Sequence, residues 1–401
     1  SLHDALPIWS VPTTPRATSR QRIPVRRVSV RMAPVWVLAH RWSPGGAAQA
    51  ERLRRVTLPH PPLPVLADGL VASTPTVDDV PALAALATAA KQAVTGSGSV
   101  GEESVAMEVT GIGSWTRRQL VVRAEDDPAP VAWVRVHDRA AGRSNVDLTI
   151  APDLAHGDLV AGELLAWAEL VAVEMASLRG LGGTLLDASV HADDTHLQRW
   201  LSAAGYASTR TWLQISRPVH AQDADLPAPR EGVVVRRVAT HEDGTPVAED
   251  LQTVHRMLEE SFADHFNSYR ESFPEFLQRQ REVPGHRWDH WWIAEISVGE
   301  DDSPTGWLPG GAVVSSVLDP DDGGIAGSYI DYIGVHRLAR GRGVAKALLH
   351  TVIRDALERG RNRVALEVDA DSPTGADGLY TSMGWQTEYV TQSWHVDLDL
   401  R

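Results

Sequence analysis

The clearest hydrophobic pattern in the chain lies near its C-terminal end, where apolar residues recur three and four positions apart. This spacing is typical of one face of a helix, and its members are Ala345, Leu348, Leu349, Val352, Ile353, Ala356 and Leu357. Gly360 follows the last of them, and glycine commonly ends helices. The pattern predicts a helix over residues 343–359.

Two segments beside this helix have the pattern of strands. Residues 328–335, SYIDYIGV, are rich in β-branched and aromatic side chains, and residues 363–370, RVALEVDA, alternate apolar with polar or small side chains. A strand, a crossover helix and a second strand usually form a right-handed unit whose strands are parallel. We therefore expect these two strands to be parallel neighbours.

The loop before the helix, RGRG at 340–343, has the composition of an anion site. The first turn of a helix leaves backbone N–H groups without partners, and its dipole favours negative charge. Gly341 and Gly343 allow a ligand to approach the backbone, and Arg340 and Arg342 supply positive charge suited to phosphate. The loop predicts a site for a phosphate or pyrophosphate.

Three kinds of phosphate site compete for this loop. A P-loop requires Gly-Lys followed by Ser or Thr, which is absent. A dinucleotide fingerprint is met by Gly341, Gly343 and Asp369, but Lys346 stands where its third glycine belongs. The third pattern is the Arg/Gln-x-x-Gly-x-Gly/Ala loop of the GNAT acyltransferases, which Arg340, Gly343 and Ala345 fit.

A second motif supports the third pattern. Residues 378–385, GLYTSMGW, resemble the Leu-Tyr-x-x-x-Gly-aromatic segment that closes the GNAT core. The strand, the loop, the helix, the second strand and this segment follow one another as in the acyl-coenzyme A half of that family. The resemblance is strong over about 75 residues and extends over 232–401. The alternative is a generic strand–helix–strand unit with a glycine-rich turn.

The resemblance implies a mixed α/β sheet of the GNAT type, acetyl-CoA as co-substrate and no metal. In the family, the strand before the loop supplies backbone hydrogen bonds to pantetheine and the thioester. The cofactor-binding residues implied in this way are Ile333, Gly334, Val335, Arg340, Gly341, Arg342, Gly343, Val344 and Ala345. Ser372 stands near the position where many members carry an asparagine.

The resemblance also implies catalytic candidates. The tyrosine of the Leu-Tyr segment is a frequent general acid in the family, here Tyr380. Sequences similar to mycothiol synthase carry a carboxylate where this chain has Tyr329, so the base lies elsewhere. Asp331 is two residues further along, on the same face of a regular strand, and is the candidate base. Glu367 and Asp369 on the neighbouring strand are the reserves.

The chain contains a weak internal repeat. Residues 70–90 and 232–258 both have the pattern strand, turn and helix, and 200–215 resembles 379–396. Residues 217–231 are rich in Pro, Asp and Ala, as in linkers. We expect two GNAT-like domains, 62–216 and 232–401, an arrangement similar to the tandem architecture of mycothiol synthase.

The N-terminal copy lacks the features of the C-terminal one. Its corresponding loop offers Asp153, His156 and Asp158 in place of two arginines, and Leu201 stands at the position of Tyr380. A carboxylate near a helix N-terminus repels a diphosphate. We interpret this copy as degenerate, with a scaffold or acceptor-shaping role; an active domain with an unusual loop is the alternative.

The charge distribution sets the first 60 residues apart. They contain ten arginines and only two acidic residues, a net charge of +8, whereas the remaining 28 basic and 50 acidic residues give −22. They lack a sustained period, so we interpret 1–60 as a disordered or spurious extension. A basic arm for nucleic acid is the alternative, against which the acidity of the remainder argues.

Composition narrows the chemistry further. The chain has no cysteine, which excludes disulfides, thiol catalysis and cysteine-ligated zinc, and agrees with a cytoplasmic location. The longest apolar helical stretch, 159–178, carries three glutamates, so no membrane span is expected.

These observations predict an acetyl-CoA-dependent N-acetyltransferase that acts on a primary amine of a small molecule. Acidic residues on the first helices of 232–401, such as Glu259 and Glu260, hint at a cationic acceptor. A catalytically inactive acyl-CoA sensor and a nucleic-acid-binding protein are the alternatives. The acceptor and the oligomeric state stay open.

Overall fold

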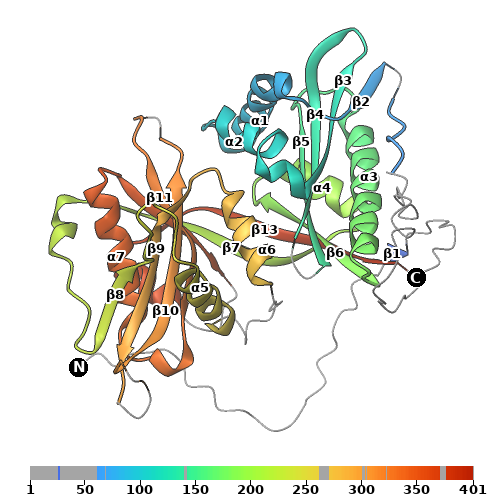
Figure 1. Ribbon diagram of the computed structural model, residues 1–401. Helices are drawn as coiled ribbons and strands as arrows, with labels where there is room; N and C mark the ends of the chain where they lie inside the picture. Colours follow the sequence, from blue (N-terminus) through green and yellow to red (C-terminus); the bar gives the residue numbers. More distant parts are fainter. Residues whose placement is uncertain are drawn as a thin grey trace, which may run out of the picture.

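The computed structural model describes residues 26–27, 61–67, 69–139, 142–261, 271–299, 303, 305–321, 323–370 and 376–400. They form a continuous mixed sheet with the strand order β2-β3-β4-β5-β6-β13-β7-β12-β11-β10-β9-β8 (Figure 1). The mixed α/β sheet expected from the sequence is confirmed.

The N-terminal half of the sheet uses the first group of strands. The elements are β2 (Leu70–Ser73), η2 (Val77–Asp79), α1 (Val80–Thr95), α2 (Glu102–Val109), η3 (Ile112–Thr116), β3 (Arg117–Ala124), β4 (Asp127–Asp138), β5 (Arg143–Ile150), α3 (Gly157–Leu178), β6 (Gly183–His191), α4 (Thr195–Ala203) and β7 (Ala207–Pro218). Helix α3 packs on one face of the sheet through a large apolar cluster, and α1 and α2 pack on the other face.

The C-terminal half repeats this order. Its elements are β8 (Val233–Arg237), α5 (Ala248–Ser261), α6 (Phe273–Arg281), β9 (His286–Ser297), β10 (Trp307–Leu318), β11 (Gly327–Val335), η6 (Arg337–Ala339), α7 (Val344–Glu358), β12 (Arg363–Asp369), α8 (Ala376–Ser382) and β13 (Gln386–Asp399). The predicted helix and its two parallel strands are α7, β11 and β12, and the prediction is confirmed.

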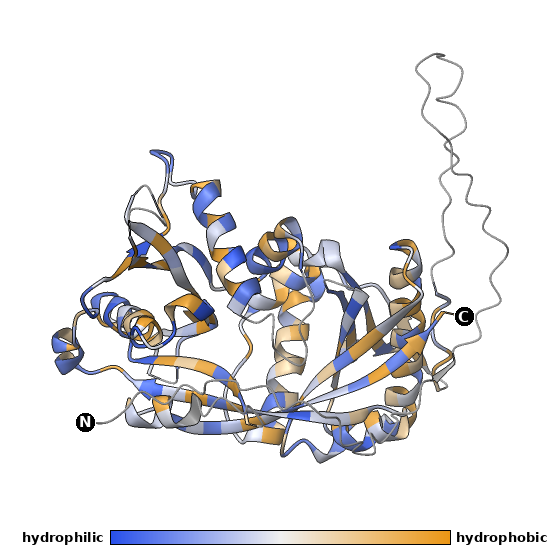
Figure 2. Ribbon diagram, turned by 90° about the horizontal axis from the view of Figure 1, so that it is seen from below, coloured by the Kyte–Doolittle hydropathy of each residue, from blue (hydrophilic) through white to orange (hydrophobic). Residues whose placement is uncertain are grey.

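The apolar periodicity explains which faces are buried. Five residues of the predicted stripe of α7 are buried against the sheet, all except Ala345 and Leu357, which are partly exposed. Leu251, Val254 and Leu258 of α5 are buried on the opposite face. The strands also follow a periodic pattern: in Figure 2, hydrophobic and hydrophilic residues alternate along them. Each helix therefore covers the sheet with the side that its sequence makes apolar.

The last strands of the two halves are exchanged. Strand β7, which ends the N-terminal half, pairs with β12 and β13 of the C-terminal half. Strand β13, which ends the chain, pairs with β6 of the N-terminal half. Figure 1 shows both strands crossing the middle of the molecule. The sheet thus continues across the boundary proposed from the sequence at 217–231.

The segment 217–231 also packs on the C-terminal half. It includes the end of β7 and η5 (Ala221–Asp225), and Arg217 forms a bidentate ion pair with Asp223. Arg354 of α7 donates to the Leu226 carbonyl at 3.0 Å. This segment is therefore bound along α7 in addition to connecting two units.

Of the first 60 residues the structure describes only Arg26 and Arg27. Their backbone forms the short strand β1 (Arg26–Arg27), parallel to Leu398 and Asp399 of β13. The interpretation of 1–60 as an extension otherwise lies outside the described residues. No helix in the described part of the chain combines the length and the apolar character needed to cross a bilayer.

A buried ionic cluster joins the two halves around Glu282, directly after α6. Its carboxylate accepts hydrogen bonds from Thr116 and Arg117 at 2.8 Å and contacts His137 at 2.9 Å. Burial opposes its ionisation, but the hydrogen bonds from His137, Thr116 and Arg117 outweigh burial and lower the pKa of Glu282 to about 2. Burial also lowers the pKa of His137, so Arg117 supplies the positive charge near neutral pH.

We expect Glu282→Gln to lower the free energy of unfolding at pH 7 by about 3–5 kcal/mol, because it leaves a buried arginine without its anion. The folded-state pKa lies below the ordinary 4.5, so this stabilisation is present above pH 4.5 and is lost as pH falls toward 2. Urea denaturation at pH 7 and pH 3 should show a smaller difference between variant and wild type at pH 3.

The matched control is Glu275→Gln. Glu275 pairs with Arg179 across the same interface, but both side chains are about a third exposed. An exposed pair contributes about 0–1 kcal/mol. Equal losses in the two variants would contradict the importance assigned to burial at Glu282.

Candidate active site

The loop before α7 has a backbone that requires its glycines. Gly341 and Gly343 have φ of 77° and 82°, in the left-handed region, and Gly343 is the N-cap of α7. The amides of Val344, Ala345 and Lys346 donate no hydrogen bond to any residue that the structure describes. These N–H groups at a helix start have the arrangement that binds phosphate groups in proteins.

The arginines around this loop have different surroundings. Arg340 is exposed and forms no ion pair with a described residue. Arg342, expected from the sequence to face phosphate, donates to the Ser297 carbonyl at 3.0 Å and so ties the loop to β9. Arg230 donates to the Gly341 carbonyl at 3.3 Å. Sequence reasoning missed Arg230, because it lies in the segment interpreted as a linker.

Strands β11 and β12 separate beside this loop. They pair only where Ser328–Ile330 of β11 meets Val364–Leu366 of β12. The following residues of β11 continue to pair with β10 on their other side. Among the residues that the structure describes, the edge of 331–335 that faces β12 therefore has no strand partner. It includes the predicted pantetheine-binding residues Ile333, Gly334 and Val335.

Gly334 is required by the packing of α5. A Cβ at this position would lie 2.9 Å from the Cβ of Ser261 and 3.1 Å from a methyl group of Leu258. Helix α5 can therefore lie directly on β11 only where this strand has no side chain.

Asp331 is the extra residue of a β-bulge. Val314 of β10 is opposite Tyr332, and the next residue, Ser315, is opposite Ile330. A bulge interrupts the alternation of side chains along a strand, so the period-two argument that put Asp331 on the face of Tyr329 does not apply here. Burial and the negative charges of Glu367 and Asp331 raise the pKa of Tyr329, so its phenol stays protonated.

The surroundings of Asp331 favour its protonated form. Its side chain is partly buried, and the Ser316 hydroxyl donates to its Oδ1 at 3.2 Å. Burial raises the pKa of Asp331 to about 7, against the opposing effects of Ser316 and Arg279. A carboxyl group that titrates near neutral pH is suited to accept a proton in catalysis.

The reserve carboxylates differ in accessibility. Glu367 reaches solvent, and desolvation by its neighbours raises its pKa although Gln214 donates a hydrogen bond to it. Asp369 is buried and forms an ion pair with Arg210 at 3.4 Å. Asp369 thus contributes to the sheet, and Glu367 is the reserve that a substrate can reach.

Tyr380 lies on α8 and is partly buried. Its ring packs edge-on against Trp385, with 5.7 Å between the ring centroids. Helix α8 comes directly after residues 371–375, so the predicted role of Ser372 lies outside the described residues.

The acidic residues that hinted at a cationic acceptor are mostly paired within the protein. Glu260 contacts His336 at 3.2 Å, Glu271 pairs with Arg279, and Glu275 pairs with Arg179 at 2.9 Å. Internal partners neutralise this face, so its acidity gives little support for a cationic acceptor.

The N-terminal half keeps the separation of its parallel strands, since β5 and β6 pair only where Arg143–Asn145 meets Leu185–Asp187, but the loop before its helix differs. Two residues separate Leu154 from α3, whereas four separate Ala339 from α7. His156 takes the left-handed N-cap position with φ of 59°, and Asp158 follows it into the first turn of α3. The loop is thus shorter and carries a carboxylate where the C-terminal loop is glycine- and arginine-rich.

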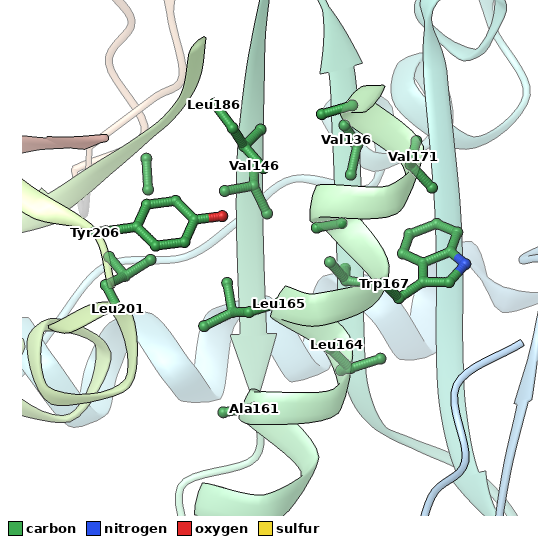
Figure 3. Close-up of a cluster of buried hydrophobic side chains, with 14 of the residues drawn as sticks. Val136, Val146, Ala161, Leu164, Leu165, Trp167, Val171, Leu186, Leu201 and Tyr206 are labelled. Carbon is green, nitrogen blue, oxygen red and sulfur yellow. The ribbon is translucent and has the colours of Figure 1, made fainter. Parts of the chain in front are cut away.

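The strands of the N-terminal half lack the candidate base. Strands β4 and β5 pair without an irregularity, so Val146 corresponds to Ile330, Asp147 corresponds to Tyr332, and Asp331 has no counterpart. Leu201 takes the place of Tyr380 and is fully buried. Figure 3 shows Val146, Leu201 and Tyr206 within the apolar cluster of this half.

A cleft of about 1390 Å³ is nevertheless present in the N-terminal half. It is lined by α1, the loop before α3 and the start of α4, and it extends to His191, Tyr389 and Thr391. Trp200 and Arg199 each donate to the exposed carboxylate of Asp158 at 2.6 Å. These hydrogen bonds lower the pKa of Asp158 and keep a negative charge beside the helix start.

Comparison with known proteins agrees with this geometry. Residues 254–385 match the family model described as "Acetyltransferase (GNAT) family", so the C-terminal half contains a GNAT acetyltransferase domain. The predicted family is confirmed for this part of the chain.

A relative and two solved structures extend the comparison. The chain is 29% identical over 201 residues to a mycothiol acetyltransferase of Jonesia denitrificans, a match that covers 49% of this chain and 57% of that protein. A GCN5-related N-acetyltransferase from Sphaerobacter thermophilus has a similar fold, with TM-score 0.63, 24% identity and coverage of 83% and 97%. A tandem GNAT protein from the clavulanic acid biosynthesis pathway aligns with TM-score 0.55, 16% identity and coverage of 82% and 98%. The chain therefore has the fold of tandem GNAT proteins.

Proposed function

We propose that the protein is an acetyl-CoA-dependent N-acetyltransferase that acts on a primary amine of a small molecule, with the C-terminal half carrying the chemistry. The observation that carries this proposal is the separation of β11 from β12 between the N–H-lined loop and the Asp331 bulge. The family match to the same part of the chain supports it. A cytoplasmic location remains a prediction from the sequence.

The residues present fit coenzyme A. Its diphosphate would lie at the amides of Val344 and Ala345 with Arg340 nearby, because these donors are not used within the described protein. Its pantetheine would lie along the open edge of residues 333–335 and bind to the backbone like an added strand. The thioester would then come close to Asp331 at the point where the strands separate.

Acyl transfer requires one proton acceptor and one proton donor. An alkylamine is mainly protonated near neutral pH, since its pKa is ~10, and it attacks only after losing a proton. Asp331 takes that proton, the amine nitrogen forms a bond to the thioester carbon, and the carbon–sulfur bond breaks. The nitrogen then carries a positive charge and gives up a second proton, which replaces on Tyr380 the proton that goes to the sulfur. Tyr380 gives a proton to the departing sulfur, and backbone N–H groups of β11 stabilise the charge on the carbonyl oxygen.

We expect Tyr380→Phe to lower kcat about a hundredfold with little change in coenzyme A affinity. This is the lower end of the usual range for one acid–base group. A thiolate whose conjugate thiol has a pKa of ~8.5 is a good leaving group and depends little on a proton donor. Phenylalanine keeps the packing on Trp385. Steady-state kinetics and calorimetry provide the measurements, and wild-type kcat would assign Tyr380 to packing alone.

The function is tested by mass spectrometry of ligands that co-purify with the protein, followed by a thiol-release assay. Acetyl-CoA is offered with glucosamine, spermidine and L-lysine methyl ester as acceptor probes. Amine-dependent release of coenzyme A is the expected result. Binding of acetyl-CoA without turnover over a wider amine library would instead indicate a sensor, and no binding would overturn the proposal.

A further inference from the structure

The exchanged strand β7 introduces a residue of the N-terminal half into the C-terminal site. Gln214 of β7 lies directly opposite Glu367 of β12 on one side and Tyr389 of β13 on the other. Without the exchange, β12 would not have β7 as its neighbour.

The side chain of Gln214 forms three hydrogen bonds, all to groups of the C-terminal half. Its Nε2 donates to Oε2 of Glu367 and to Oγ1 of Thr391, the latter at 3.2 Å. Its Oε1 accepts from the Tyr329 hydroxyl at 3.5 Å. Gln214 is only 9% exposed, and a buried amide is costly unless it is hydrogen-bonded. A carboxylate is a pure acceptor, so the amide nitrogen has to face Glu367.

We propose that Gln214 is a positioning residue for the transferase site and that it fixes the Glu367 carboxylate for binding the ammonium form of the acceptor amine. This inference rests on the proposed function. One carboxylate oxygen is held by Gln214, and the group as a whole stays accessible to solvent. A preorganised anion then attracts the incoming amine beside Tyr329 and Asp331, where the proton is removed.

The charged groups around Glu367 make its ionisation depend on the hydrogen bond from Gln214. The titratable groups that interact with Glu367 are Tyr329 on β11, Asp369 on β12 and Tyr389 on β13, and Asp331 acts in turn on Tyr329. None of them supplies a positive charge. Arg210 of β7 is instead paired with Asp369. Gln214 is thus the donor that supports the ionised form of Glu367 against desolvation.

The test compares Gln214→Leu with wild type, using whichever of glucosamine, spermidine and L-lysine methyl ester the wild type acetylates fastest. We expect KM for the amine to rise about tenfold at pH 7, as for loss of one hydrogen bond to a charged group, with kcat within about twofold. The rise should be larger at pH 6 than at pH 8, because Glu367 without its donor ionises only at higher pH. Coenzyme A affinity and melting temperature report whether the fold is intact.

Gln392→Leu is the matched control. Gln392 lies on the other exchanged strand and bonds to Trp394, so its loss tests the same chemical change away from Glu367. An unchanged KM and pH profile in Gln214→Leu, or equal effects in both variants, would overturn the inference. Absence of acyl transfer in the wild type would instead overturn the proposed function, so the two failures are distinguishable.

Discussion

Replacing Arg340 with glutamate and Gly343 with aspartate together is expected to abolish coenzyme A binding in calorimetry. The aspartate places a negative charge at the start of α7, and it requires a left-handed backbone at φ of 82°. Its Cβ would also lie 3.0 Å from Arg230. The single variant Arg340→Glu, at an exposed position without strain, should weaken binding at least about tenfold through charge alone.

The corresponding change in the N-terminal loop is the control. Ala155→Glu with Gly157→Asp should leave affinity unchanged, because we place the single coenzyme A site in the C-terminal half. Gly157 has ordinary space for a side chain, with its nearest atoms at 3.8 Å and 3.9 Å. Undiminished binding in the C-terminal double variant, or loss of binding in the N-terminal one, would contradict this assignment.

Replacing Asp331 with asparagine is expected to lower kcat/KM for the amine by about 10²–10⁴ at pH 7, the usual span for one general base. In the wild type the rate should rise as pH increases through about 7, where Asp331 ionises. In the variant, the increase in rate around pH 7 should be absent. Its activity should rise only as the pH approaches the pKa of the amine, because a larger fraction of the amine is then neutral. A pH–rate profile from pH 5.5 to 9.5 measures both effects.

The same substitution should not destabilise the fold near neutral pH. The folded-state pKa of Asp331 is raised above its ordinary 3.8, so ionisation favours unfolding, and stability is lost as pH rises from about 4 to 7. Asparagine does not ionise, so the variant should not lose stability in this pH range. Above pH 7 it should be at least as stable as the wild type. The same change at the exposed Asp225, Asp225→Asn, serves as the control for stability. If the pH–rate profile of Asp331→Asn is the same as that of the wild type, Glu367 becomes the candidate base.

The candidate site was predictable where its parts are close in sequence. The loop 340–345 depends on glycine conformation, helix-start amides and charge, all of which a short segment carries. Glu367 was found for a similar reason, because it follows from alternation along one strand. Arg230 and Gln214 were missed, because they come from segments more than 100 residues earlier and nothing in their local pattern marks them.

The sequence by itself determined helix α7, the parallel strands β11 and β12 beside it and the loss of the loop chemistry in the N-terminal copy. These properties follow from periodicity, glycine positions and local charge. Only the tertiary structure decided the bulge at Asp331, the bond of Arg342 to β9 and the exchange of β7 with β13. Strand pairing joins backbone groups that every sequence provides, so the choice of partner depends on the packing of the whole sheet. The same packing raises the pKa of Asp331, because burial is a property of the assembled fold.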